Sequence, residues 1–255
     1  FALMGFVVFS SHDVLIKTLG GSYEVFQIVF FSVLFSFVPM TLIMATDRTE
    51  ASFVPHKPLY LLLRTCTVII GMICGFYAFT VLTLAEAYAL LFASPLLITA
   101  LSVPFLGETI GIHRAIAVLI GLVGMIVIIQ PGGDEFRPET LLVVLSAFSY
   151  AMCQIWTRRL SGMGDLATMV SVQQICYLVV AGLLVVMNIV MQRPDSDNPT
   201  IDFLLRAPAT ASLIDYLFIL ICGISVLILS VTSAHAYRVL EASVIAPFEY
   251  VAIPS

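Results

Sequence analysis

Long apolar runs, separated by short polar and turn-rich segments, fill almost the whole sequence. Crossing the ~30 Å hydrocarbon core of a bilayer takes about 20 residues of helix. A ninth apolar run begins near Ala242. We expect the full-length protein to contain at least a tenth span. The pattern predicts an all-α fold, a polytopic bundle of transmembrane helices. The eight complete runs lie near residues 1–19, 25–46, 58–80, 86–106, 112–130, 138–160, 166–191 and 213–238.

Composition agrees with a membrane protein and excludes some partners. Hydrophobic residues fill 60% of the 255 positions and charged residues 11%, with a mean hydropathy of +1.09. Since soluble domains usually carry about a quarter charged residues, the solvent of this chain is membrane lipid. The net charge of −5 excludes nucleic acid as a partner, because binding it needs clustered Lys and Arg. The five cysteines have unrelated spacings, which indicates small buried side chains rather than a metal site.

The distribution of Lys and Arg predicts how the chain is oriented. With a cytoplasmic N-terminus, the inner loops and helix ends carry seven basic residues and the outer ones four. This excess predicts a multi-pass protein of the cell (inner) membrane whose N-terminus is cytoplasmic. Arg64 lies less than two turns inside the third run, so we expect it to snorkel to the cytoplasmic face. The inner set is Arg48, Lys57, Arg64, Arg114, Arg158, Arg159 and Arg238, and the outer set is Lys17, Arg137, Arg193 and Arg206.

The two halves of the chain repeat several short phrases in the same order. "QIVF" begins at Gln27 and "QICY" at Gln174, and "LAEA" in the first half returns as "VLEA" in the second. We predict two repeats, residues 1–130 with spans one to five and residues 138–255 with spans six to nine. Because five is odd, the second repeat enters the membrane inverted. Inverted repeats are common in secondary transporters, whose substrate site lies near the midplane.

The same motifs resemble a known family. "RTCTVIIGMICGFYAFTVLTLAEAYALLFASPLLITALSVPFLGE", followed by "GIHRAIAVLIGLVGMIVIIQPG", is similar to the first repeat of the EamA-type drug/metabolite transporter superfamily. "AYRVLEASVIAPFEY" is similar to the family's ninth-span opening. The resemblance implies ten helices in two inverted five-helix repeats, and movement of small organic solutes across the membrane. Where the family often has a basic residue in the second span, this chain has Ser32.

Glu249 is the leading candidate for a functional residue. It lies about eight residues into the ninth run, roughly 12 Å deep by helix rise. An ionisable residue at that depth costs several kcal/mol unless it is paired, neutral or wetted, and so indicates a transport pathway. We expect Glu249 to line a cavity and either bind cationic substrate groups or carry a proton. The alternative is a structural carboxyl bonded to a neighbouring helix.

Charged and proline residues of other spans are further candidates. Asp13 and Lys17 are four residues apart and share a helical face, so they form either a structural pair or a substrate and coupling site. The neighbouring His12 can titrate near neutrality. Pro95 and Pro247 are predicted well inside helices, where each removes a backbone donor and kinks the helix near the repeat interface.

Polar and amphipathic side chains within the spans could form a mixed aromatic and hydrogen-bonding cavity for a small solute. They are Gln27, Tyr77, Tyr88, Tyr150, Gln154, Trp156, Gln174, His235 and Tyr250.

Other motifs have structural interpretations. Glu86 and Glu241 are expected to open helices whose N-termini they complement electrostatically. Glu108 in "LGE" ends a helix, where a negative charge is unfavourable, so we expect it to pair with His113 or Arg114 as a structural latch. Gly71 and Gly75 form a GxxxG pair that favours close helix packing.

The sequence lacks the motifs of catalysis. It has no HExxH, no GxxxxGK[ST] and no nucleophile elbow, so we expect no enzymatic activity and no cofactor. We predict a secondary transporter that moves a small-molecule substrate (amino acids, related metabolites or drugs) by alternating access. Proton coupling and exchange both stay open. The alternatives are an intramembrane enzyme and a receptor or structural membrane protein that transports nothing.

Overall fold

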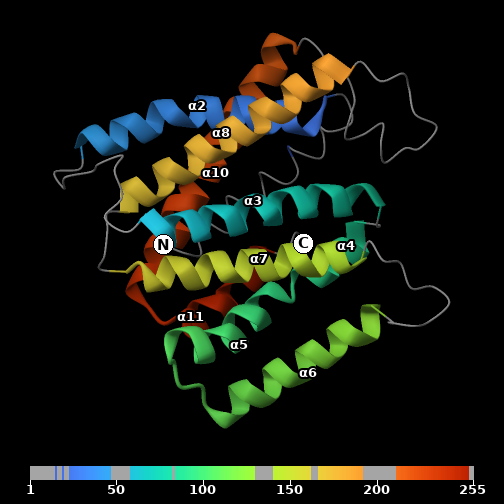
Figure 1. Ribbon diagram of the computed structural model, residues 1–255, viewed down its shortest axis with the longest axis vertical. Helices are drawn as coiled ribbons and strands as arrows, with labels where there is room; N and C mark the ends of the chain where they lie inside the picture. The colour runs from blue at the N-terminus through green and yellow to red at the C-terminus, as the bar shows by residue number, and fades with distance from the viewer. Residues whose placement is uncertain are drawn as a thin grey trace. The chain divides into compact units, whose positions relative to one another are not determined.

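The structure of this chain, a computed structural model, consists of helices (Figure 1). Among the residues that it describes there is no β-strand, so the all-α prediction is confirmed. By clustering of contacts the helices form two compact units. The described residues are 15, 19, 23–46, 58–81, 84–129, 140–161, 166–191 and 211–252.

Unit 1 contains the helices α2 (Val25–Thr46) and α8 (Leu166–Met191) and most of α10 (Leu213–Val239). Helices α2 and α8 are antiparallel neighbours. Phe30 of α2 lies against Gly182, and further along α2 the Ser36 hydroxyl accepts a 3.1 Å hydrogen bond from Gln174. Met40 of α2 packs with buried apolar residues of α8 and α10 in this unit.

Helix α10 crosses α2 at a glycine. A Cβ atom at Gly223 would lie 2.2 Å from the carbonyl oxygen of Ser32, so only glycine allows this approach. The Ser32 hydroxyl donates a 3.3 Å hydrogen bond to the carbonyl of Ile219, one turn earlier on α10. Ser32 is therefore a packing residue of unit 1, at the position where the resembling family often has a basic side chain.

Unit 2 holds the remaining elements. Helices α3 and α7 lie side by side, α5 packs on α7, and α6 packs on α5 (Figure 1). The end of α10 beyond His235 also belongs to this unit. The elements are α3 (Pro58–Val81), α4 (Leu84–Leu91), α5 (Ser94–Leu106), α6 (Ile112–Ile129), α7 (Thr140–Arg159), α11 (Ala242–Ile245) and the 3₁₀ helix η1 (Ala246–Ala252).

The predicted GxxxG pair accounts for the close contact of α3 with α7. A Cβ atom added to Gly71 would lie 3.4 Å from Cβ of Ser149, and one added to Gly75 would lie 3.0 Å from Oγ of Ser146. The Ser146 hydroxyl uses this proximity to donate a 2.7 Å hydrogen bond to the carbonyl of Gly71. Small residues thus let two helices approach and add a polar bond, as in other membrane helix pairs.

The fourth predicted span is interrupted before its proline. It consists of α4 and α5, separated at residues 92–93, and Pro95 occupies the second position of α5 rather than a helix interior. Pro95 has no backbone N–H to offer the carbonyl of Leu91. The Ser94 hydroxyl donates to that carbonyl instead, at 2.5 Å. The sequence predicted a kink at Pro95 inside one helix; the structure instead has two helices with a break before Ser94, so the expected interior position of Pro95 is wrong.

The described helices have the surface of a membrane protein. Five of them are long and apolar enough to cross a bilayer, and two shorter apolar helices accompany them. One face of α6 exposes Ile116, Leu119, Ile120, Val123 and Val127. An apolar surface of this size is stable in lipid but not in water. The prediction of a polytopic transmembrane bundle is therefore confirmed.

The compact units differ from the predicted repeats. Unit 1 comprises residues 1–56, 163–235 and 251–255, and unit 2 comprises residues 57–162 and 236–250. Each unit therefore takes helices from both predicted repeats. The repeats at 1–130 and 138–255, and the inverted relation between them, stay predictions.

Candidate functional site

Glu249 is the centre of a buried polar cluster in unit 2. Its residue surface is only 7% exposed. Its Oε1 atom accepts a 2.6 Å hydrogen bond from the hydroxyl of Tyr237 and a 3.1 Å bond from the hydroxyl of Tyr150. Among the described residues both bonds converge on this one oxygen, and both donors are neutral.

Three elements bring these groups together. Helix α7 supplies Tyr150, which also hydrogen-bonds the buried side chain of Gln154 one turn later. The end of α10 supplies Tyr237, which is fully buried. Glu249 comes from η1, where the ninth run changes from α-helix to 3₁₀ helix after Ile245. Pro247 lies within this 3₁₀ helix.

A second carboxylate, Glu108, joins the ends of several helices of unit 2. Gly107 ends α5 with a left-handed φ of 72°, which glycine adopts without strain and which turns the chain at "LGE". The Glu108 carboxylate then accepts bonds from the backbone N–H groups of Ala242 at 2.8 Å and Ser243 at 3.1 Å. The Nε atom of Arg158 lies 3.9 Å from the same carboxylate. Glu108 thus compensates the unpaired amides at the start of α11.

Cationic side chains complete this arrangement, which we name the Glu108 latch. Arg158 and Ser161 donate to the carbonyl of Arg238 at the end of α10, at 2.8 and 2.6 Å. Arg114 donates to the hydroxyl of Ser243 at 3.4 Å. The latch predicted from the sequence exists, but its expected partners, His113 and Arg114, are wrong. Arg114 bonds Ser243, and Glu108 itself bonds the α11 amides and Arg158.

The two glutamates expected to open helices have little part in either cluster. Glu241 occupies the position before α11 and its side chain makes no capping hydrogen bond there, because Glu108 fills that role from the end of α5. Glu86 is the third residue of α4 and is exposed. Their electrostatic effect on the helix starts stays a prediction.

Arg64 does not snorkel. It is 3% exposed, and its Nε atom donates a 2.8 Å hydrogen bond to Oγ1 of Thr157 on α7. Thr157 in turn donates to the carbonyl of Cys153 at 2.8 Å. The Nη1 atom of Arg64 is buried without a hydrogen-bond partner among the described residues. The snorkelling expected from the sequence is wrong, because α7 covers the path from Arg64 to the surface.

Other predicted site residues of unit 2 lie elsewhere. Trp156 packs with the rings of Tyr60 and Phe105, at centroid distances of 5.8 and 6.3 Å. None of its described contacts is with Glu249. Pro247 is exposed on η1. The backbones of Tyr77, Tyr88 and Tyr250 lie on α3, α4 and η1, whereas their side chains fall outside the description. His12, Asp13 and Lys17 lie outside the described residues.

Unit 1 has a separate set of buried polar groups. Gln27 and Gln174, matched by the predicted repeat, are both buried, and Gln174 donates to Ser36. Just before α2, Glu24 is fully buried and accepts a hydrogen bond from Asn188 of α8. His235 is exposed on α10.

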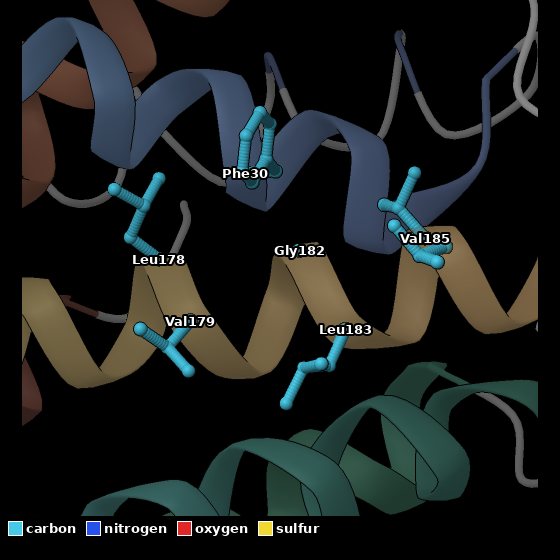
Figure 2. Close-up of a pocket in the computed structure, with 7 residues that line it drawn as sticks. Phe30, Leu178, Val179, Gly182, Leu183 and Val185 are labelled. Atoms are coloured by element: carbon cyan, nitrogen blue, oxygen red, sulfur yellow. The ribbon is translucent and has the colours of Figure 1, made fainter.

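A pocket of about 420 Å³ lies along α2 and α8 in unit 1. Figure 2 shows Phe30 of α2 above Leu178, Val179, Gly182 and Leu183 of α8. Every lining side chain is apolar, so the pocket offers no group that could orient a polar solute. We take the buried polar cluster around Glu249 as the candidate site for a polar solute.

Sequence analysis missed Tyr237 as a site residue. It was visible only as the aromatic member of the Ala-Tyr pair that precedes "RVLEA". An aromatic residue twelve positions before an intramembrane carboxylate has no periodic signal, because the chain reverses between them.

Comparisons with known proteins add an independent line of evidence. Residues 1–130 match the family described as "EamA-like transporter family". The chain is 28% identical over 249 residues to a Rickettsia conorii protein named "S-adenosylmethionine uptake transporter", covering 96% of this chain and 81% of that protein. A Rickettsia prowazekii protein of the same name is 27% identical over the same shares of both chains. A Vibrio cholerae protein named "Riboflavin transporter" is 28% identical over 76% of this chain and 59% of that protein.

Proposed function

Because this chain belongs to the EamA-like transporter family, we propose that it carries a small organic cation of the S-adenosylmethionine type across the cell membrane. The family and the named relatives are transporters, so the chain is a multi-pass membrane transporter and not an enzyme. The proposal concerns the substrate, the groups that bind it and the way the chain moves it.

The observation that carries the proposal is the incomplete compensation of Glu249. A buried carboxylate is expensive unless it is paired with a cation or protonated. Its described donors are two neutral hydroxyls, both on Oε1. A substrate cation can therefore supply the missing charge, and the two tyrosine rings beside it favour cations as well.

The relatives supply the chemical class. S-adenosylmethionine has a permanent sulfonium cation, and two relatives that cover 96% of this chain are named as its uptake transporters. Riboflavin has no such cation, although a relative of similar identity is named for it. The Glu249 cluster therefore favours the sulfonium compound over the flavin.

We further propose a secondary transporter that works by alternating access, with the N-terminus in the cytoplasm. In that orientation the Glu108 latch lies at the cytoplasmic end of unit 2 and opens during release of the substrate. After the substrate is released, Glu249 takes up a proton or a second cationic solute, and the transporter then returns to its starting conformation. The absence of a nucleotide-binding motif from the sequence supports a mechanism without ATP.

Uptake into proteoliposomes tests the substrate. We expect the full chain to accumulate labelled S-adenosylmethionine, and excess unlabelled compound to block this accumulation. Excess riboflavin should leave it unchanged. Accumulation of riboflavin without S-adenosylmethionine would replace the proposed substrate, and accumulation of neither would reject both.

A further inference from the structure

Arg64 has no ion-pair partner among the described residues, and it contacts α7 near the end of that helix, away from the residue that bonds Glu249. The guanidinium group has five N–H donors and stays charged in proteins. Nε is bonded to Thr157, while Nη1 is buried without a partner among the described residues. No described carboxylate lies within salt-bridge distance, since Glu108 bonds α11 and Arg158 while Glu249 bonds two tyrosines.

A buried cation in this state needs an anion. Leaving a buried donor without a hydrogen-bond partner is unfavourable, and more so for a charged group. The planar fork of arginine matches a carboxylate better than any other small anion of a metabolite except phosphate. The missing partner therefore has the chemistry of a carboxylate that arrives with the solute.

The two α7 residues that Arg64 and Glu249 contact define the length of solute that would fit between them. Arg64 bonds Thr157 and Glu249 bonds Tyr150, two contact points that are seven residues apart on one helix face. At about 1.5 Å per residue this separation is roughly 10 Å. Cys153 lies between the two points on the same face of α7. The two charges of opposite sign thus face one stretch of α7.

We propose that Arg64 binds the carboxylate of the solute whose cation binds Glu249, so that unit 2 selects dipolar, amino-acid-type cations. The inference rests on the proposed function and extends it to a second binding residue. In S-adenosylmethionine the sulfur and the carboxyl carbon are joined through three carbons, which span about 5 Å. A hydrogen-bonded contact of about 3 Å at each end brings the total to roughly 11 Å. This length fits the separation along α7.

Two probes that differ only in the carboxylate test the assignment. The full chain in detergent is titrated with S-adenosylmethionine and with its decarboxylated form, which keeps the sulfonium and the amine. We expect Arg64→Gln to weaken binding of S-adenosylmethionine at least about 30-fold, as for loss of a buried charge partner. Binding of the decarboxylated form should change less than about two-fold. Arg64→Lys should recover part of the difference, because it keeps the charge without the fork.

Two further variants separate a binding role from a structural one. Thr157→Val removes the described partner of Arg64 but no charge, so it should weaken S-adenosylmethionine less than Arg64→Gln does and leave binding of the decarboxylated form unchanged. Glu249→Gln should weaken both probes, because both contain the cation. If Arg64→Gln does not fold, Arg64→Lys still decides, since it should weaken S-adenosylmethionine more than the decarboxylated form. Equal losses for both probes in the Arg64 variants would overturn the assignment and leave the proposed function standing.

Failure of the proposed function has a different signature. In that case the wild-type chain binds neither probe. The carboxylate site at Arg64 is then tested by comparing the thermal unfolding of the chain in acetate with that in chloride, at equal ionic strength. A stabilisation by acetate that Arg64→Gln abolishes keeps the carboxylate site, and identical curves for the two proteins remove it.

Discussion

Glu249 is a buried and Glu108 a partly buried glutamate of unit 2, and their carboxylates are compensated in opposite ways. Glu108, with a side chain that is 8% exposed, accepts two backbone N–H bonds at the start of α11 and lies 3.9 Å from Arg158. Glu249 accepts two tyrosine hydroxyls on one oxygen, and no described cation bonds to it. In this structure the backbone and an arginine compensate the first carboxylate. Under the proposed function, the cation of the substrate compensates the second.

This difference indicates which carboxylate has a structural role. A charge that is satisfied by main-chain groups stabilises the fold in every state that keeps the contact. A charge that has only neutral partners is destabilising in the empty protein and gains energy when a ligand cation arrives. The two glutamates should therefore respond in opposite directions in assays of stability and of binding.

The largest expected effect is the loss of substrate binding in Glu249→Gln. Removing the charge should weaken binding of S-adenosylmethionine by about 100-fold, or roughly 3 kcal/mol. Thermal stability in detergent should be unchanged or slightly higher, because a buried charge is gone. Glu241→Gln is the matched control, since Glu241 is exposed and makes no capping bond. Unchanged uptake by Glu249→Gln would remove Glu249 from the pathway.

Glu108→Ala should produce the reverse result. Loss of two bonds to the α11 amides and of the Arg158 contact should lower the free energy of unfolding by about 2 kcal/mol. Binding of the substrate to the folded fraction should change less than about three-fold, because Glu108 is not expected to touch the substrate. Thermal unfolding and equilibrium binding on the same preparation measure both quantities. Stability equal to wild type would show that the latch contributes nothing to the fold.

The two tyrosines sharpen the comparison further. Tyr237→Phe removes the 2.6 Å bond to Glu249 and Tyr150→Phe the 3.1 Å bond. Hydrogen bonds to charged groups contribute about 1.5–3 kcal/mol, and shorter ones contribute more. Both bonds exist in the empty protein, so we expect their loss to lower the free energy of unfolding, by more for Tyr237→Phe than for Tyr150→Phe. The opposite ranking in thermal unfolding would contradict the arrangement around Oε1.

The sequence predicted the helices well because bilayer crossing imposes one length and one polarity on each. The predicted runs at 58–80, 166–191 and 213–238 match α3, α8 and α10 within about two residues. Pro95 predicted a kink in the fourth span, whereas the structure has a break at residues 92–93. That position depends on the Ser94 hydroxyl, which takes the carbonyl of Leu91.

The partners inside the site could not be predicted from the sequence. Glu249 stood out because an intramembrane carboxylate is rare. Its donor Tyr237 and the donors to Glu108 come from elements that meet only through the tertiary fold. Arg64 was misinterpreted for the same reason, because the snorkelling argument considers one helix and ignores the α7 residue Thr157 that holds the side chain.

A third glutamate, Glu24, is expected to have the smallest effect on stability. This effect is tested by changing the pH. It lies just before α2 in unit 1, where burial raises the pKa of its carboxyl from 4.5 to about 7 against the opposing effect of a hydrogen bond from Asn188. Since the folded chain then binds the proton more tightly than the unfolded chain, the stabilisation is complete below about pH 4.5 and is lost as the pH rises to about 7.

Glu24→Gln replaces the carboxyl with a neutral amide and should flatten this part of the stability profile, by an amount of the order of 1 kcal/mol. Thermal unfolding in detergent at a series of pH values measures the slope, with Glu241→Gln again as the exposed control. A slope that survives in Glu24→Gln would assign the titration to another group. A slope that disappears would show that Glu24 resembles Glu249, because both carboxylates are buried without a described cation. Glu108 differs from both, since the α11 amides and Arg158 compensate its charge.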